Sequence, residues 1–182
     1  FMISSVNIAL PAIGKEFKTD AVLLSWVATS YLLAAAVSLV PFGKLADIYG
    51  RKKIFLGGQI IVTITSLLTA ISISAHMLII FRIFQGIGGG GIFALVYVVL
   101  TDVSAPEQRA RTISFASLVW GVSSLIGPTL GGFIVTWFSW RWIFFINIPI
   151  GVGAAVLAAR VLPRAARRQE PLDLASALLL VV

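Results

Sequence analysis

The feature that most constrains this chain is a series of long apolar stretches that carry almost no charge. They cover residues 1–13, 22–42, 54–75, 77–100, 112–136 and 142–159, and a further stretch opens at residue 174. A helix needs about 20 apolar residues to cross the hydrocarbon core of a bilayer, and most of these stretches have that length. Because their apolar residues are continuous and do not alternate, they indicate helices and not barrel strands. The expected fold class is therefore all-α, a polytopic helical bundle in the membrane.

The composition supports lipid as the solvent of these helices. Hydrophobic residues make up 59% of the 182 residues and charged residues only 12%, whereas roughly a quarter of a soluble domain is charged. The chain holds one histidine and no cysteine, and no apolar stretch contains a pair of carboxylates. No catalytic residue, metal site or cofactor is therefore expected, and the chain is not expected to be an enzyme.

The basic residues divide unequally between the segments that connect the apolar stretches. If successive helices alternate in direction, ten basic residues fall on one side and three on the other. The larger set is Lys44, Arg51, Lys52, Lys53, Arg109, Arg111, Arg160, Arg164, Arg167 and Arg168, and the smaller set is Lys15, Lys18 and Arg141. Lysine and arginine accumulate on the cytoplasmic side, so the larger set is predicted to be cytoplasmic. This topology explains the net charge of +7, and nucleic acid is not expected as a partner.

Aromatic residues agree with this orientation. Four tryptophans fall at the predicted outer ends of the helices, where an interfacial aromatic belt is expected: Trp26, Trp137, Trp140 and Trp142. The stretches also predict how the chain is organised. Residues 1–162 form a six-helix bundle with a truncated first helix, 163–173 a cytoplasmic loop, and 174–182 the start of another membrane helix. Both ends of the chain lie inside apolar stretches, so we expect it to be part of a longer protein.

The segment GKLADIYGRKK, between the second and third stretches, combines glycines, an acid and a basic run. Gly43 and Gly50 are expected at the ends of a tight turn, while Arg51 and Lys52 anchor the next helix at the interface. Asp47 gains nothing from an anionic membrane surface, so we expect it to face fixed cations or a helix N-terminus as a latch. A solvated loop whose charges only determine topology is the alternative.

Arg82 is the only fixed charge inside an apolar stretch. It lies about six residues, or roughly 9 Å along a helix, from the outer boundary at His76. A charge within the membrane costs several kcal/mol, so Arg82 is predicted to face the central cavity and to take part in coupling or substrate binding. Gln85, one turn away, and Asn7 in the first stretch are expected to share that cavity. The alternative is an arginine that snorkels to the outer headgroups.

Glycines follow Arg82 at positions 86, 88, 89, 90 and 91. They spell the dinucleotide-binding pattern G-x-G-x-x-G, which normally lies between a strand and a helix. Here no strand is expected before them and they lie deep in a membrane stretch, so that function is rejected. In lipid such glycines instead permit close contact between helices.

The fifth stretch contains the glycine- and proline-rich sequence GVSSLIGPTLGG. Pro128 cannot donate a hydrogen bond to the carbonyl of Ser124, so a kink is expected there. Four glycines remove side chains around it and let another helix pack closely: Gly121, Gly127, Gly131 and Gly132. A bend with a purely structural role is the alternative.

These motifs resemble those of the major facilitator superfamily, and the resemblance covers essentially the whole chain. The Asp47 segment resembles the signature loop G-x-L-a-D-r-x-G-r-k-x, although Ile48 stands where a basic residue is common. RIFQGIG resembles the fourth-span motif R-x-x-q-G-x-g, and the fifth stretch resembles the antiporter motif g-x-x-x-G-P-x-x-G-G. The resemblance implies that Asp47 and Arg51 brace the two halves of the protein in the outward-open state. It also implies that Arg82 takes part in proton or substrate coupling.

Two further features resemble the fourteen-span drug/proton antiporter branch: the sequence WRWIFFINIPIG and the short interval before residue 174. This implies the amino-terminal half of a secondary transporter that works by alternating access and exports a hydrophobic or amphipathic compound in exchange for protons. The implied partners are that small-molecule substrate, protons, the lipid bilayer and a carboxy-terminal half of the same protein. The implied location is a prokaryotic plasma membrane. A carrier of a metabolite or sugar, and a non-transporting membrane sensor, stay open as alternatives.

The first stretch departs from that branch, whose pattern there is L-D-x-T-I-V-N-V-A-L-P. Asn7, Ala9, Leu10 and Pro11 match, but Met2 stands at the acidic position. All seven acidic residues of the chain lie in connecting segments or at the edges of apolar stretches. A carboxylate that carries protons must therefore come from another part of the protein, or the coupling differs.

Overall fold

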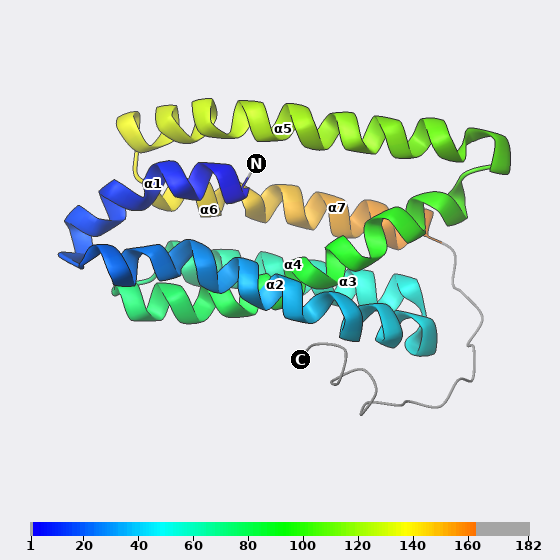
Figure 1. Ribbon diagram of the computed structural model, residues 1–182, viewed down its shortest axis with the longest axis horizontal. Coiled ribbons are helices and arrows are strands. Elements are labelled where there is room, and N and C mark those ends of the chain that lie inside the picture. Colours follow the sequence, from blue (N-terminus) through cyan, green and yellow to red (C-terminus); the bar gives the residue numbers. More distant parts are fainter. Residues whose placement is uncertain (1, 163–182) are drawn as a thin grey trace.

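The computed structural model of the chain describes residues 2–162, and within that part it contains helices and no strand. The helices are α1 (Met2–Phe17), α2 (Ala21–Tyr49), α3 (Arg51–Ala70), α4 (Ala75–Val103), η1 (Pro106–Gln108), α5 (Arg109–Trp137), α6 (Arg141–Phe145) and α7 (Asn147–Val161). They run roughly parallel to one long axis (Figure 1). The predicted all-α fold class is confirmed. The loop predicted at 163–173 and the helix predicted from 174 lie outside the described residues.

Five segments of the described residues are long and apolar enough to cross a membrane: Ala21–Tyr49, Arg51–Ala70, Ala75–Asp102, Pro106–Trp137 and Arg141–Val161. They correspond to the second to sixth predicted stretches. The last segment is interrupted at Ile146, between α6 and α7. Pro149 explains the interruption, because it lacks the N–H group that would bond to the carbonyl of Phe145.

The turn between α2 and α3 is shorter than predicted. Gly43 lies within α2, which continues to Tyr49, so the turn expected at Gly43 is not formed. The residues that follow Gly43 are mostly good helix formers, and one glycine costs too little to end the helix. Gly50 alone leaves the helical conformation, with a φ of 95° that glycine tolerates because it has no Cβ. Its N–H group donates to the carbonyl of Ala46 at 3.0 Å.

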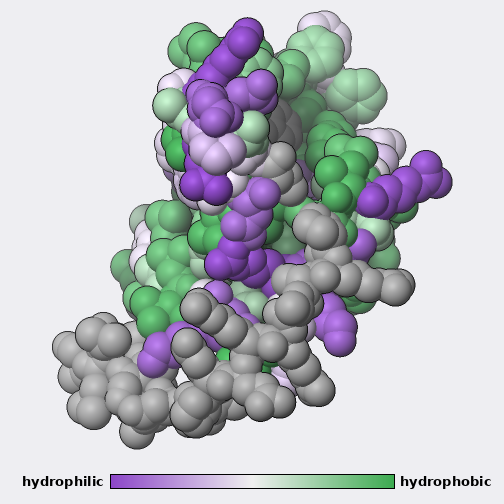
Figure 2. Space-filling model, turned by 90° about the vertical axis from the view of Figure 1, so that its right-hand side faces the viewer, coloured by the Kyte–Doolittle hydropathy of each residue, from purple (hydrophilic) through white to green (hydrophobic). Residues whose placement is uncertain are grey.

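The connecting segments gather at opposite ends of the bundle. The α1–α2 turn, the α3–α4 turn and the α5–α6 junction lie at the left in Figure 1, and the α2–α3 and α4–α5 connections lie at the right. We name these the Lys18 end and the Lys52 end. Figure 2 faces the Lys52 end and shows hydrophilic side chains gathered there among hydrophobic ones. Successive helices therefore alternate in direction, and the cytoplasmic location of the Lys52 end stays a prediction.

Glycines bring α4 very close to both α2 and α3. A Cβ on Gly86 would lie 2.4 Å from the carbonyl oxygen of Tyr31 in α2. On the other side, a Cβ on Gly88 would lie 2.8 Å from the carbonyl oxygen of Gly58 in α3. Neither distance is possible for a real side chain, so the glycine run is what allows α4 to lie between α2 and α3.

Candidate functional site

Arg82 lies inside the bundle, with only 1% of its surface exposed. Its Nε donates to the carbonyl of Val27 in α2 at 3.0 Å, and its Nη1 donates to Oε1 of Gln85 at 2.8 Å. The guanidinium carbon lies 4.2 Å from the centre of the Tyr31 ring, within the range of a cation–π interaction. In this conformation the side chain is enclosed by helices and does not snorkel to the headgroups.

Gln85 extends this group of residues to α3. It is fully buried, and its Nε2 donates to Oγ of Ser66 at 2.7 Å. Ser66 in turn donates to the carbonyl of Val62 in its own helix at 2.7 Å. Val27, Tyr31, Ser66, Arg82 and Gln85 together form what we call the Arg82 cluster. A continuous series of contacts therefore joins α2, α3 and α4 at one level of the bundle.

The charge of Arg82 has no carboxylate partner among residues 2–162, where the ion pairs all lie at the ends of the bundle. It is compensated instead by a backbone carbonyl, an amide oxygen and the face of an aromatic ring. Ser30, one turn beyond Val27 on α2, is 3% exposed, and its Oγ has no hydrogen-bond partner in the described structure. The cluster thus combines an ionic group with unused hydrogen-bonding capacity nearby.

Asn7 is the one predicted cavity residue that the structure does not bring to this cluster. It lies on an exposed part of α1, and no hydrogen bond connects it with Arg82 or Gln85. Tyr31 and Ser66 were missed by the sequence analysis. Both are polar residues inside apolar stretches, and this could have marked them as candidates. Nothing in the sequence, however, indicated that they face the arginine.

A second set of charged residues lies at the Lys52 end. The Arg51 guanidinium, at the start of α3, pairs with the carboxylate of Asp102 near the end of α4. A carboxylate oxygen of Asp47 in α2 lies 3.8 Å from another nitrogen of the same guanidinium. We call these three residues the latch network. Asp47 faces a fixed cation, as the sequence predicted, whereas the sequence analysis missed Asp102, an acid two residues beyond the end of an apolar stretch.

Lys52, in α3, forms hydrogen bonds with the end of α7. Its Nζ donates to the carbonyl oxygens of Ala159 and Leu162 at 2.6 and 2.7 Å. These carbonyls belong to the last turn of a helix, where no further N–H group is available and a positive charge is favourable. Lys52 therefore ties α3 to α7 in addition to any contact with the membrane surface. A Cβ on Gly43, by contrast, would meet nothing within 4 Å.

A third network, at the Lys18 end, joins α1 to α6. Arg141 donates to both oxygens of Glu16, at 2.6 and 2.8 Å, and to the carbonyl of Ser72 at 3.0 Å. Trp140 donates from Nε1 to Glu16 at 2.7 Å. Partial burial alone would raise the pKa of Glu16, but these two hydrogen bonds and the charge of Arg141 lower it below its ordinary value of 4.5.

This network corrects the prediction of the aromatic belt. Trp140 is only 2% exposed, and it packs edge-on against Phe17 and Phe144. Its indole N–H donates to the carboxylate of Glu16, so the ring lies within the bundle and not at the lipid interface. The other three tryptophans of the predicted belt are exposed: Trp26, Trp137 and Trp142.

The predicted kink residues divide into two groups along α5. Near Pro128 the helix touches α1, where Oγ of Ser5 donates to the carbonyl of Gly127 at 2.8 Å. A Cβ on Gly131 would lie 2.9 Å from the Cα of Ser5, and one on Gly132 would make only ordinary contact. A Cβ on Gly121 would meet nothing within 4 Å. The helix continues through Pro128 without a break (Figure 1).

Comparison with known proteins identifies the family of the chain. The sequence profile described as the Major Facilitator Superfamily matches residues 1–179. The chain belongs to this superfamily. It is therefore part of an integral, multi-pass membrane transporter, as the apolar helices also indicate.

One similar relative is Multidrug resistance protein 3 of Bacillus subtilis, which is 38% identical to this chain over 159 residues. The matched residues make up 87% of this chain and 31% of the relative. Another is Efflux pump dotC of Dothistroma septosporum, 41% identical over 145 residues, which are 80% of this chain and 25% of the relative. The chain thus spans about a quarter to a third of the curated relatives that it matches.

A solved structure supports the fold of this superfamily member. The inward-open xylose transporter XylE from E. coli matches 91% of this chain and 45% of its own chain, with a TM-score of 0.70. The sequence identity is 15%, so the likeness concerns the fold alone.

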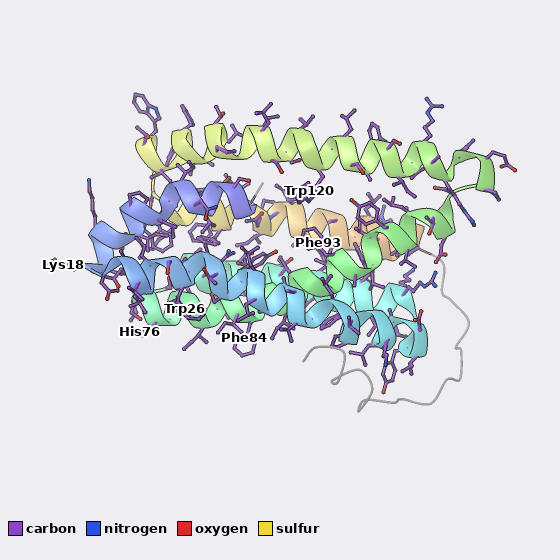
Figure 3. The ribbon with its side chains drawn as sticks, in the orientation of Figure 1. Lys18, Trp26, His76, Phe84, Phe93 and Trp120 are labelled. Carbon is purple, nitrogen blue, oxygen red and sulfur yellow. The ribbon has the colours of Figure 1, made fainter. Side chains whose placement is uncertain are left out.

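The superfamily member also has a pocket of about 530 Å³ at the Lys18 end, lined by Lys18, Thr19, Asp20, Val22, Leu23, Trp26 and His76. Figure 3 shows Lys18, Trp26 and His76 at this end of the bundle. An apolar groove of about 300 Å³ lies between α3, α4 and α7 and includes Phe55, Val99 and Leu157. The lining residues of neither space belong to the Arg82 cluster.

Proposed function

We propose that this transporter exports a hydrophobic or amphipathic compound from a prokaryotic cell by alternating access, in exchange for protons. The observation that carries the proposal is the Arg82 cluster, which keeps an ionic group inside the bundle. A buried charge in a membrane protein is costly and marks substrate or ion pathways. Relatives named Multidrug resistance protein 3 and Efflux pump dotC support the direction and the class of substrate.

The packing suggests how the conformational change is transmitted. Glycine contacts and the Arg82 cluster join α2, α3 and α4 closely, which suits a mechanism in which one half of the transporter rocks against the other. The latch network lies at one end of these three helices. The side chain of Asp47 is 59% exposed there, so it is available to groups of the other half as well as to Arg51. We expect the latch network to favour one of the two end states.

The acid that carries the proton is proposed to lie outside this chain. All acids among residues 2–162 lie at the ends of the bundle: Glu16, Asp20, Asp47, Asp102 and Glu107. Coupling would then require Arg82 to respond to a carboxylate supplied by the rest of the protein. The small-molecule substrate is expected near the midplane between the two halves.

Flux measurements test the proposal. The full-length protein is reconstituted into vesicles, and efflux of a hydrophobic fluorescent dye is followed with an imposed pH gradient, without one, and with a protonophore. We expect gradient-dependent flux that the protonophore abolishes. Flux of a sugar in place of the dye would favour a carrier of another solute class, and absence of any flux would favour a sensor.

The latch is tested by Asp47→Asn in the same vesicles. We expect flux to fall several-fold, because the changed charge shifts the equilibrium between end states, with little loss of folded protein. Glu107→Gln is the matched control, since it neutralises an exposed acid at the same end but outside the latch network. Equal flux in wild type and Asp47→Asn would leave Asp47 without a role in the transport cycle.

A further inference from the structure

We propose that the apolar groove between α3, α4 and α7 binds one acyl chain of an anionic phospholipid from the leaflet at the Lys52 end. The proposal concerns a lipid site and does not depend on which solute is transported. The groove has a volume of about 300 Å³. Every residue that lines it is phenylalanine, valine, leucine or alanine, so no lining side chain offers a hydrogen bond to a polar ligand.

The groove has the position and depth of an acyl chain in one leaflet. Its lining on α7 runs from Ala154 to Val161, the last residue of that helix, and its lining on α4 begins at Val96. Seven residues of helix rise roughly 10 Å, and half of the hydrocarbon core of a bilayer is about 15 Å thick. The groove therefore begins at the end of the bundle, where headgroups are expected, and extends through much of one leaflet.

Lys52 places a positive charge at the edge of this groove. Its Nζ donates to the carbonyls of Ala159 and Leu162, and Leu162 is itself a lining residue. An ammonium group has three donors, so one is left for a phosphate oxygen. Among residues 2–162, no carboxylate forms an ion pair with Lys52. The groove therefore combines apolar walls with a fixed cation at one end.

The charge of this whole end complements an anionic headgroup. Among the described residues, the Lys52 end carries seven basic side chains and three acidic ones, whereas the Lys18 end carries three and two. The seven are Lys44, Arg51, Lys52, Lys53, Arg109, Arg111 and Arg160, and the three are Asp47, Asp102 and Glu107. Basic pockets between membrane helices bind the headgroups of anionic lipids. An apolar helix from elsewhere in the protein could also cover the groove, but it would not require a cation at one end.

Two neighbouring lysines distinguish a specific contact from general attraction. Lys52→Gln removes the charge at the groove, whereas Lys53→Gln removes an equal charge from the next residue. Position 53 is two residues from Phe55, or about 200° around the helix, so Lys53 lies on the face away from the groove and is exposed. Lys52→Arg keeps the charge and controls for a loss that comes only from weaker attachment of α7.

Two substitutions on α7 test the groove itself. Ala158 lines the groove, so Ala158→Phe places a ring where the acyl chain would lie. Val156→Phe is the matched control, because it adds a ring to the same helix about 200° away, at an exposed position that does not line the groove. Only the first substitution should interfere with an acyl chain in the groove.

The experiment measures lipid binding to the purified full-length protein by native mass spectrometry. The protein is titrated with phosphatidylglycerol, which is anionic, or with phosphatidylcholine, which is zwitterionic and has the same acyl chains. For wild type we expect phosphatidylglycerol to bind about fivefold more tightly. Lys52→Gln should remove this preference, and Lys53→Gln and Lys52→Arg should keep it. Ala158→Phe should weaken the binding of phosphatidylglycerol severalfold, and Val156→Phe should leave it unchanged.

Three results would overturn the inference. Equal binding of the two lipids to wild type would mean that the Lys52 end does not select an anionic headgroup. An equal loss of preference in Lys52→Gln and Lys53→Gln would mean that the attraction is general and not at the groove. Wild-type binding of phosphatidylglycerol to Ala158→Phe would mean that the acyl chain lies elsewhere, or that another part of the protein covers the groove.

Discussion

The α2–α4 contact and the α1–α5 contact show two ways in which this chain uses glycine. In both, a glycine allows a backbone from another helix to come within 3 Å of where a Cβ would be, at Gly86 and Gly90 in α4 and at Gly131 in α5. Along α4 the close contact is extensive, because the glycines at positions 86, 88, 89, 90 and 91 are all buried against α2 or α3. Along α5 it is confined to the part near Pro128.

The rest of α5 has little cover from the described residues. Large apolar side chains before the proline are exposed in several directions, and Leu125 is 78% exposed. Trp120 is 58% exposed as well. The difference indicates that α2, α3 and α4 pack closely against one another. The apolar side chains of α5, by contrast, must be covered by lipid or by other parts of the protein. We therefore expect changes in α4 to affect folding and changes in α5 to affect transport.

The largest effect is expected for Gly86→Val compared with Gly121→Val. A Cβ at position 86 would meet a backbone carbonyl at 2.4 Å, whereas position 121 is open. Overpacking of this kind costs about 3 kcal/mol, so Gly86→Val should greatly reduce the amount of folded protein. Thermal unfolding in detergent and size-exclusion chromatography of membrane extracts measure the difference. Equal stability of the two variants would mean that the α2–α4 contact is much more adaptable than described.

An intermediate effect is expected for Pro128→Ala in α5. The alanine restores a backbone N–H that can bond to the carbonyl of Ser124 and so removes the constraint on the helix. We expect altered flux or proton leak at nearly normal abundance. Pro41→Ala in α2 is the matched control, because α2 is held in place by its contact with α4. Unchanged flux and leak in Pro128→Ala vesicles would reduce the role of this proline to packing.

The smallest effect is expected for Glu16→Gln, which weakens the attachment of α1 to α6. Both side chains of the Glu16–Arg141 pair are partly exposed, so the loss should be below about 1 kcal/mol. Because the pKa of Glu16 is lower in the folded protein, its contribution to stability is present above about pH 4.5 and is lost as the pH falls through the lowered value. Melting temperatures of wild type and variant should therefore differ at pH 7 and converge in acid. A difference that persists unchanged at low pH would contradict this assignment.

The sequence alone determined the helical fold and the family of this protein. Hydrophobic length is a property of consecutive residues, so each apolar stretch identified its helix without knowledge of any neighbour. The same holds for the glycine run after Arg82, whose lack of side chains predicts close contact whichever helix is the partner. Arg82 itself was conspicuous because a charge within an apolar stretch needs no structural context to be unusual.

Only the tertiary structure decided which residues meet. Arg51 and Asp102 are 51 positions apart, and Arg141 and Glu16 are 125 apart, so neither pair leaves a local pattern in the sequence. In the sequence, Trp140 cannot be distinguished from the exposed Trp137 and Trp142. In the structure, its indole N–H donates to the carboxylate of Glu16 in α1, and this contact accounts for its position inside the bundle. Helix formation depends on local spacing, whereas the faces that helices turn towards one another depend on how all of them pack. Among residues 2–162, that packing decided that Arg82 is compensated by a backbone carbonyl, an amide and a ring, and not by an acid.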